Sequence, residues 1–446
     1  MTTTTQAGLS LTPPADVHRT LARTILADGF DLVFDYEKSH GSWLHYSRSG
    51  REYLDFLTFF GSNPIGYNHP RMKDPEFQRI LNRVAQLKPS LSDLYTVEYA
   101  WFVETLRRLA MPAHFKYAFF IEGGALAIEN ALKVAFDWKV RRNRAKGIPG
   151  EKGQQVMHFR EAFHGRTGYT LSLTNTDPKK TDFFPKFPWP RIENPKLRFP
   201  VTAEVEADVA AAEQRAVEQM ERAFADNPDD IAAIIIEPIQ AEGGDNHFRP
   251  QFLQTLQRLA HQHECLFVVD EVQTGVGLTG RMWAHEHFGL TPDALAFGKK
   301  TQVCGILAGP RVDDEPQNVF KVGSRINSTW GGGLTDMVRF ARYLEVIEEE
   351  RLVDNARVVG ERLRKGLEEV QGESGLMSNA RGLGLMIAFD LPDGEKRAQV
   401  HRKLIENGLL LLTCGPRSIR FRPALNLSAA DADTALDIVR RTLKQM

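Results

Sequence analysis

Alternating strand and helix patterns are the feature that most restricts the fold of this chain. Runs of β-branched and aromatic residues, such as "YAFFI" and "IAAIII", are separated by segments with helical periodicity, such as "QFLQTLQRLAHQHE". The strand-like runs lie at 116–122, 155–159, 231–237, 266–271 and 293–297. Strands that alternate with helices favour a mainly parallel sheet with helices on both faces. We therefore predict an α/β fold, with its functional site at the carboxyl ends of the strands.

The length of the chain and a change in its texture indicate more than one domain. A chain of 446 residues is too long for one small core. After Trp330 a long helical pattern leads into a shorter α+β segment, so a boundary is expected near 331–333. The predicted parts are an N-terminal segment at 1–75, a large domain at 76–330 and a small α+β domain at 331–446. The N-terminal segment is expected to begin as a mobile tail of about a dozen residues and then to join the small domain.

Composition argues against several classes of partner. A net charge of −1 gives no basic surface for nucleic acid or an anionic membrane. The longest apolar runs are far shorter than a membrane span, and the chain start resembles no signal peptide. The three cysteines, Cys265, Cys304 and Cys414, are sparse and odd in number. They fit a reducing cytoplasm better than a disulfide framework.

A pair of glycines follows the first strand-like run, in "EGGALAIEN" at 122–130. Glycines between a strand and a helix allow backbone N–H groups to converge on an anion, to which the helix N-terminus adds positive partial charge. The segment lacks the pattern of a nucleotide P-loop. A tight turn between strand and helix is the alternative reading, and both stay open at this point.

Two further strand ends carry aromatic and charged residues. After "VMHF", Phe163 could stack on a flat ring while Arg166 brings a guanidinium near it. After "IAAIII", Glu237 and Glu242 could perform acid–base chemistry or hold an arginine. Ordinary solvated loops are the alternative for both segments.

The last two strands end in a carboxylate and in a pair of lysines. Asp270 ends an apolar strand, so it needs a cationic or hydrogen-bonding partner, and Gln273 is spaced to point into the same site. Lys299 and Lys300 follow "DALAFG", where desolvation and a like-charged neighbour lower the pKa of a lysine amine. A neutral amine can attack a carbonyl to form a Schiff base. A solvated charge run is the competing interpretation, which the position after an apolar strand disfavours.

One ligand could satisfy all of these strand-end residues together. It has an anionic phosphate, a flat ring, a ring nitrogen that Asp270 can keep protonated, and an aldehyde for a lysine. Pyridoxal 5′-phosphate meets all four requirements.

Two other motifs are rejected. "GVGLTG" at 275–280 matches a dinucleotide-binding pattern, but it does not follow its strand directly and no helix pattern opens on it. "HQHEC" at 261–265 ends an amphipathic helix and has no second ligand pair at zinc spacing. No metal site is predicted.

At this point the sequence resembles the class III aminotransferases, a family of fold-type I pyridoxal-phosphate enzymes. "AFHGRTG", "EPIQAEGG", "DEVQTG", "FGKK" and "IRFRP" occur in the order of that family across nearly the whole chain. "FFIEGGALAIENALKVAFDWK", "FGKKTQVCG" and "NSTWGG" resemble its lysine 6-aminotransferases more than its ornithine or 4-aminobutyrate aminotransferases. The resemblance implies a seven-stranded sheet sandwiched by helices and a smaller C-terminal α+β domain.

The resemblance also implies roles around the cofactor ring. Lys299 is implied as the Schiff-base lysine and Asp270 as the partner of the pyridine nitrogen. Gln273 is expected near the ring hydroxyl, with Val272 on one ring face and Phe163 on the other.

Other implied roles concern the phosphate and the assembly. Gly124 and Ala125 are expected to supply backbone donors to the phosphate. Thr329 is expected to reach it from a second subunit, which implies a homodimer with shared active sites. Asn327 is expected to help position the substrate.

The implied substrates differ in charge. The usual amino acceptor, 2-oxoglutarate, has two carboxylates, for which Arg166 and Arg420 are the candidate partners. Lysine that reacts through its ε-amine has one carboxylate, which Arg166 can hold, so Glu242 is expected to neutralise Arg420 in that half of the reaction. The expected function is therefore ping-pong transfer of the ε-amino group of L-lysine to 2-oxoglutarate. Another ω-aminotransferase, a pyridoxal-phosphate aminomutase and a catalytically inactive binding or scaffold relative are the alternatives.

Overall fold

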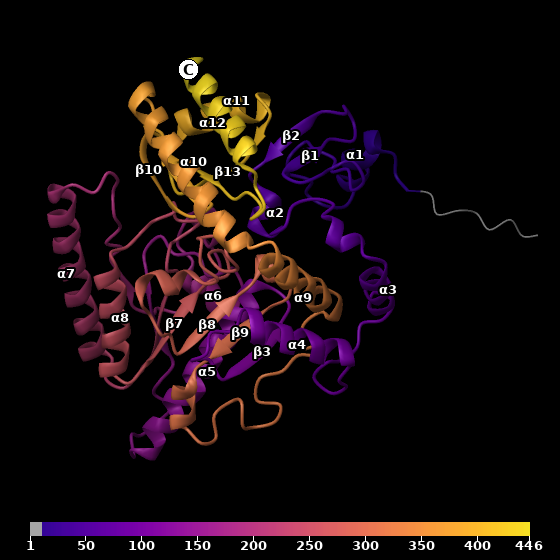
Figure 1. Cartoon of the computed structure of the whole chain (residues 1–446). Helices are drawn as coiled ribbons and strands as arrows, with labels where there is room; N and C mark the ends of the chain where they lie inside the picture. The colour runs from indigo at the N-terminus through magenta and orange to yellow at the C-terminus, as the bar shows by residue number, and fades with distance from the viewer. Residues whose placement is uncertain (1–10) are drawn as a thin grey trace, which may run out of the picture.

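A seven-stranded sheet forms the centre of the computed structural model, which describes residues 11–446 (Figure 1). In spatial order its strands are β3 Tyr117–Ile121, β9 Cys304–Ala308, β8 Ala294–Phe297, β7 Leu266–Asp270, β6 Ile231–Ile236, β4 Gln155–Phe159 and β5 Arg191–Ile192. Neighbouring strands from β8 to β5 pair in parallel, whereas β9 pairs antiparallel with β8 and with β3. The predicted mainly parallel sheet is confirmed.

Helices cover both faces of this sheet. Successive residues of a strand point to opposite faces, so a strand of apolar residues presents apolar side chains to helices on both sides. On β6, Ala233 and Ile235 share a core with α5, Gly124–Ala145. Ile234 and Ile236 belong to the other core, together with apolar residues of α8, Pro250–Gln262. Every residue of β6 is buried, as expected of a strand covered on both faces.

A smaller C-terminal unit lies above the large sheet in Figure 1 and is coloured orange to yellow. Its antiparallel sheet has the order β10 Ser378–Leu383, β11 Met386–Asp390, β14 Ser418–Phe421 and β13 Leu412–Cys414. Two helices, α10 Leu352–Ser374 and α12 Ala429–Lys444, pack against each other in this unit.

The two ends of the chain share a third sheet. It consists of β1 Trp43–His45, β2 Glu52–Asp55 and β12 Leu409–Leu410. Leu54 of β2 pairs in parallel with Leu409 of β12, so N-terminal and C-terminal residues are joined by backbone hydrogen bonds. The limits of the three predicted domains stay a prediction, and most of the predicted tail lies outside the described residues.

The remaining helices connect and cover these sheets. They are α1 Val17–Leu21, α2 Thr58–Gly61, α3 Pro75–Val84, α4 Val97–Leu109, α6 Gly168–Leu173, α7 Ala203–Asp226, α9 Leu334–Glu349 and α11 Gly394–Glu406. The short 3₁₀ helices are η1 Pro14–Asp16, η2 Pro70–Lys73, η3 Pro178–Lys180, η4 Ala284–Phe288, η5 Lys299–Thr301 and η6 Pro310–Asp314.

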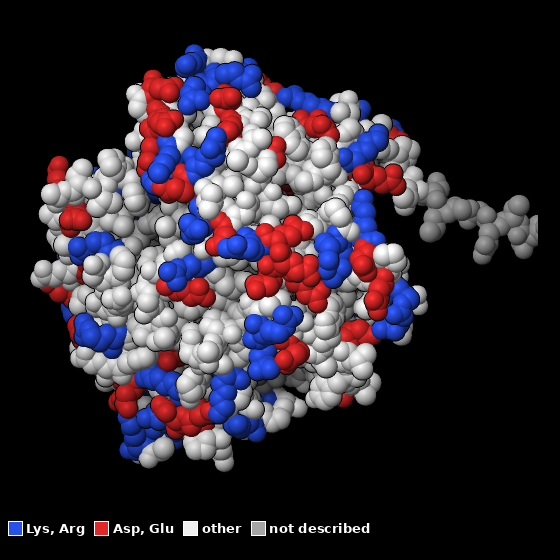
Figure 2. Space-filling model, in the orientation of Figure 1, with Lys and Arg blue, Asp and Glu red and all other residues white. Residues whose placement is uncertain are grey.

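Acidic and basic side chains are interspersed over the face seen in Figure 2, without one continuous basic patch. Between residues 11 and 446, we find no helix with both the length and the apolar character needed to span a membrane.

Candidate active site

A cavity of about 530 Å³ lies where the carboxyl ends of the parallel strands meet the start of α5. It contains ten of the twelve site residues predicted from the sequence: Gly124, Ala125, Phe163, Arg166, Glu242, Asp270, Val272, Gln273, Lys299 and Arg420. Its lining also includes Phe60, His164, Gly165, Lys180 and Glu237. The expectation that the site lies at the carboxyl ends of the strands therefore identified most residues that line this cavity.

The start of α5 approaches its neighbours too closely for larger residues. Gly123, which precedes the helix, has a φ of +98° and offers no side-chain cap. A Cβ on Gly165 would lie 2.4 Å from the Cβ of Ala125, and a Cβ on Gly124 would lie 3.1 Å from Cγ1 of Val272. The first N–H groups of a helix have no partner within it. Gly124 and Ala125, the first two residues of α5, line the cavity, and a helix start at such a place is suited to an anion.

Asp270 is held by a buried histidine. Nδ1 of His164 lies 2.8 Å from Oδ2 of Asp270, and the two side chains are 0% and 5% exposed. Oδ1 of Asp270 accepts a hydrogen bond of 3.0 Å from the backbone N–H of Val272. The predicted need of Asp270 for a partner is met by His164, for which the sequence predicted no role.

The two glutamates after β6 have different tasks. Glu237 is buried and accepts hydrogen bonds from the N–H groups of Phe163 at 2.9 Å and Ala241 at 3.0 Å. It thus fixes the loop that carries Phe163, and burial raises its pKa to about 7. Glu242 instead lies 2.7 Å from Nη2 of Arg420. The alternative of ordinary solvated acids does not hold for either residue.

Of the two adjacent lysines, only Lys299 lines the cavity. It follows β8 with a φ of +55°, a left-handed conformation that is strained for a residue with a side chain. Burial lowers the pKa of its amine, and the guanidinium of Arg420 lowers it further. Lys300 is buried and donates to the carbonyl oxygen of Gln273 at 2.9 Å, so its task is structural. The competing interpretation of a solvated charge run is wrong.

Arginines at the far side of the cavity organise Gln273. Its Oε1 accepts hydrogen bonds from Nη1 of Arg420 at 3.3 Å and from Nε of Arg422 at 3.1 Å. Arg422 is fully buried and pairs with Asp245 at 2.9 Å. Its motif "IRFRP" was noted in the sequence, but no position in that motif marks Arg422 as the partner of a residue 177 positions away.

Arg166 differs from these arginines. It is exposed at the cavity and forms no ion pair within residues 11–446. A guanidinium without a protein carboxylate is suited to a carboxylate of a ligand.

Asn327 and Thr329 lie outside the cavity lining. Both are exposed; Oδ1 of Asn327 accepts from the N–H of Ser328 at 2.8 Å, and the carbonyl oxygen of Thr329 accepts from Ser90 at 2.5 Å. Neither is brought to the other predicted residues within one chain.

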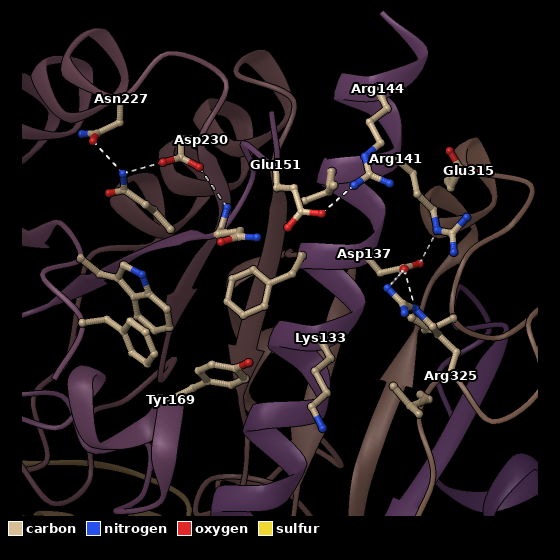
Figure 3. A pocket seen from close by; sticks show the side chains of 18 of the residues that line it. Lys133, Asp137, Arg141, Arg144, Glu151, Tyr169, Asn227, Asp230, Glu315 and Arg325 are labelled. Atoms are coloured by element: carbon tan, nitrogen blue, oxygen red, sulfur yellow. Dashed lines mark hydrogen bonds and ion pairs between the residues drawn. The ribbon is translucent and has the colours of Figure 1, made fainter. Parts of the chain in front are cut away.

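A larger cavity, of about 1310 Å³, lies along α5 (Figure 3). Its charged side chains are largely paired with each other: Asp137 with Arg141 and Arg325, and Arg144 with Glu151. None of the strand-end groups described above lines it, so the smaller cavity is the candidate active site. No three His, Cys, Asp or Glu side chains of the described chain are grouped as metal ligands would be.

Comparisons with known proteins agree on one family. The sequence profile of the family described as "Aminotransferase class-III" matches residues 26–443. The L-lysine-epsilon aminotransferase of Mycobacterium tuberculosis is 49% identical over 97% of this chain and 96% of its own length. That of Streptomyces clavuligerus is 49% identical over 94% of this chain and 92% of its own length. A solved structure of the M. tuberculosis lysine aminotransferase has a TM-score of 0.95 at 49% identity and covers 97% of this chain and 100% of that chain.

Proposed function

This chain belongs to the class III aminotransferases, and from that premise we propose that it moves the ε-amino group of L-lysine to 2-oxoglutarate. The products are 2-aminoadipate 6-semialdehyde and L-glutamate. Enzymes of this class use pyridoxal 5′-phosphate. The identity of 49% to two L-lysine-epsilon aminotransferases supports lysine as the amino donor. The geometric observation that carries the proposal is that Arg420 pairs with the carboxylate of Glu242, whereas Arg166 pairs with no carboxylate of residues 11–446.

The residues of the cavity fit pyridoxal phosphate. The glycine-bounded start of α5 suits the phosphate, and Asp270, fixed by His164, suits a protonated pyridine nitrogen. Phe163 and Val272 both line the cavity and suit the two ring faces. Bound pyridoxal phosphate supplies an aldehyde that takes up amino groups and a ring that withdraws electrons from the carbon bearing them.

The side chains of this chain supply binding and proton transfer. Lys299 would hold the cofactor covalently at rest and, once released, move a proton at the reacting carbon with its neutral amine. Asp270 would keep the ring nitrogen protonated. Because Oε1 of Gln273 already accepts from two arginines, its NH₂ group remains to donate to the ring hydroxyl.

Charge at the far side of the cavity supports two substrates in turn. Arg166 would bind the single carboxylate of lysine, and it would bind one of the two carboxylates of 2-oxoglutarate at the same place. Arg420 is 3% exposed, so an unpaired state would be costly while lysine is bound. Glu242 removes that cost, and it must release Arg420 when the second carboxylate of 2-oxoglutarate arrives.

Replacing Glu242 by alanine is expected to slow the lysine half-reaction more than the 2-oxoglutarate half-reaction. Leaving Arg420 buried and unpaired should lower the lysine rate by roughly 30-fold or more, from a cost of about 2–5 kcal/mol. The dicarboxylate pairs with Arg420 itself and needs no help from Glu242. Single-turnover rates of the two halves provide the measurement, and equal losses in both would contradict the switch.

We also propose a homodimer with shared active sites. Thr329 and Asn327 are exposed outside the cavity of their own chain, and Leu94, Tyr95 and Trp330 are large exposed apolar residues. A second copy that covers them would bring Thr329 to the phosphate and Asn327 to the substrate of its partner. Light scattering on the purified protein tests this, and a monomer in solution would refute it.

A reducing cytoplasm is the proposed compartment, because all three cysteines are buried and unpaired. Cell fractionation would test this, and recovery in an oxidising compartment would refute it.

A direct assay tests the proposed function. The purified protein, loaded with pyridoxal phosphate, is incubated with lysine and 2-oxoglutarate, and the semialdehyde and glutamate are measured. Ornithine and 4-aminobutyrate serve as competing donors. Faster turnover of either one, or retention of the amino group on a rearranged lysine, would favour another ω-aminotransferase or an aminomutase.

A further inference from the structure

Glu242 carries two cations, one on each carboxylate oxygen. Its Oε2 lies 2.7 Å from Nη2 of Arg420, and its Oε1 lies 2.6 Å from Nζ of Lys180. The Lys180 side chain is 24% exposed, whereas that of Arg420 is 3% exposed. Lys180 therefore holds Glu242 from the solvent side and Arg420 holds it from the buried side.

Lys180 does not lie at the carboxyl end of a strand, so the sequence offers no reason to expect it in the site. It ends η3, a short 3₁₀ helix in the Pro-rich connection between α6 and β5. Its Nζ lies 5.2 Å from the centre of the Phe163 ring, and Lys180 lines the cavity together with Phe163 and Glu242. Glu242 is the carboxylate with which Lys180 pairs in the described chain.

The switch requires a place for Glu242 when it leaves Arg420. Burial alone would raise the pKa of the Glu242 carboxyl, but Arg420 and Lys180 hold it below its usual range. Glu242 thus stays charged, and a charged carboxylate that loses its only cation inside a cavity is strongly disfavoured. Because the two cations use different oxygens, Glu242 can release Arg420 and keep Lys180.

We propose that Lys180 is a positioning residue of the substrate switch and retains Glu242 while a dicarboxylate occupies Arg420. This rests on the part of the proposed function in which Glu242 alternates. With Lys180 in place, Glu242 can give up its ion pair with Arg420 because its ion pair with Lys180 remains. Without Lys180, Glu242 can only remain on Arg420, so it competes with the second carboxylate of the acceptor.

Binding of two unreactive acids tests the proposal without turnover. Glutarate has two carboxylates and pentanoate has one on the same five-carbon chain, so their dissociation constants isolate the second carboxylate. Calorimetry on the holoenzyme compares wild type, Lys180→Met and Lys179→Met. Methionine keeps the aliphatic stem beside Phe163, and Lys179 is an exposed neighbour whose amine forms no contact with the cavity.

We expect Lys180→Met to raise the dissociation constant of glutarate about tenfold, which is within the usual range for coupled sites. The dissociation constant of pentanoate should stay nearly unchanged. Lys179→Met should bind both acids as wild type does. In a Glu242→Gln background, Lys180→Met should not change the dissociation constant of glutarate, because residue 242 then has no carboxylate that competes for Arg420.

Two results would overturn the proposal. An unchanged glutarate affinity in Lys180→Met would mean that Glu242 needs no second cation. A loss that persists in the Glu242→Gln background would mean that Lys180 attracts the ligand directly. Neither result depends on lysine as the donor, so failure of the proposed function would appear separately, as absence of semialdehyde with the wild-type enzyme.

Discussion

Replacing Lys299 by alanine is expected to abolish covalent attachment of pyridoxal phosphate and to lower transamination by at least about 10⁴-fold, the upper range for loss of a proton-transferring group. Lys299 is the one lysine after β8 that lines the cavity, and burial keeps its amine in the reactive neutral form more readily than that of a solvated lysine. Borohydride reduction followed by peptide mass spectrometry should find the pyridoxyl adduct on residue 299 in wild type and nowhere in the variant.

The neighbouring lysine provides the control. Lys300→Met removes the bond from Nζ to the carbonyl of Gln273 but leaves the amine of Lys299 in place. The adduct at residue 299 should persist in that variant, even if the protein is less stable. A reducible adduct that remains in Lys299→Ala, or that maps to Lys300, would refute the assignment.

The sequence could reveal the positions of Lys299, Asp270 and Phe163 because each ends an apolar strand or follows one within a few residues. In a parallel sheet the carboxyl ends of strands converge, so local position is enough to bring such residues together. The same locality explains the helix start at Gly124, where two glycines follow β3 after one intervening residue, Glu122. These parts of the site depend on contacts that the order of elements already determines.

Other parts depend on partners far apart in the chain. His164 meets Asp270 across 106 positions, and Lys180 meets Glu242 across 62. A histidine after a phenylalanine, or a lysine in a Pro-rich loop, has many possible surroundings, and no periodicity chooses among them. The pairing of Leu54 with Leu409 is hidden for the same reason.

Asn327 and Thr329 form a third case. The resemblance implies that Thr329 reaches the phosphate of a second subunit and that Asn327 positions the substrate, and a single chain leaves both residues exposed. The dimer contacts proposed for them would require the surface of a second copy, which one chain does not supply.

Replacing Asp270 by asparagine is expected to lower turnover by about 10³-fold, comparable with loss of a strong preorganised electrostatic contact. Asparagine keeps the shape of the side chain and can still accept the hydrogen bond of Val272. It carries no negative charge to hold a proton on the ring nitrogen, so the electron-withdrawing ring is weakened while the fold is retained. Single-turnover rates with lysine, together with thermal unfolding of the holoenzyme, provide the measurement.

A charge role for Asp270 is separable from a structural one. In Asp270→Ala, which opens space beside the ring nitrogen, a pyridoxal phosphate analogue methylated on that nitrogen carries the positive charge permanently and needs no carboxylate to hold a proton. If Asp270 acts by sustaining that charge, the analogue should restore a large part of the lost rate in Asp270→Ala. If Asp270 instead only anchors His164 and the loop that carries Phe163, the analogue should restore nothing, because the contact at 2.8 Å would still be missing. The second outcome would reduce Asp270 to a structural residue and remove the electronic part of the proposed mechanism.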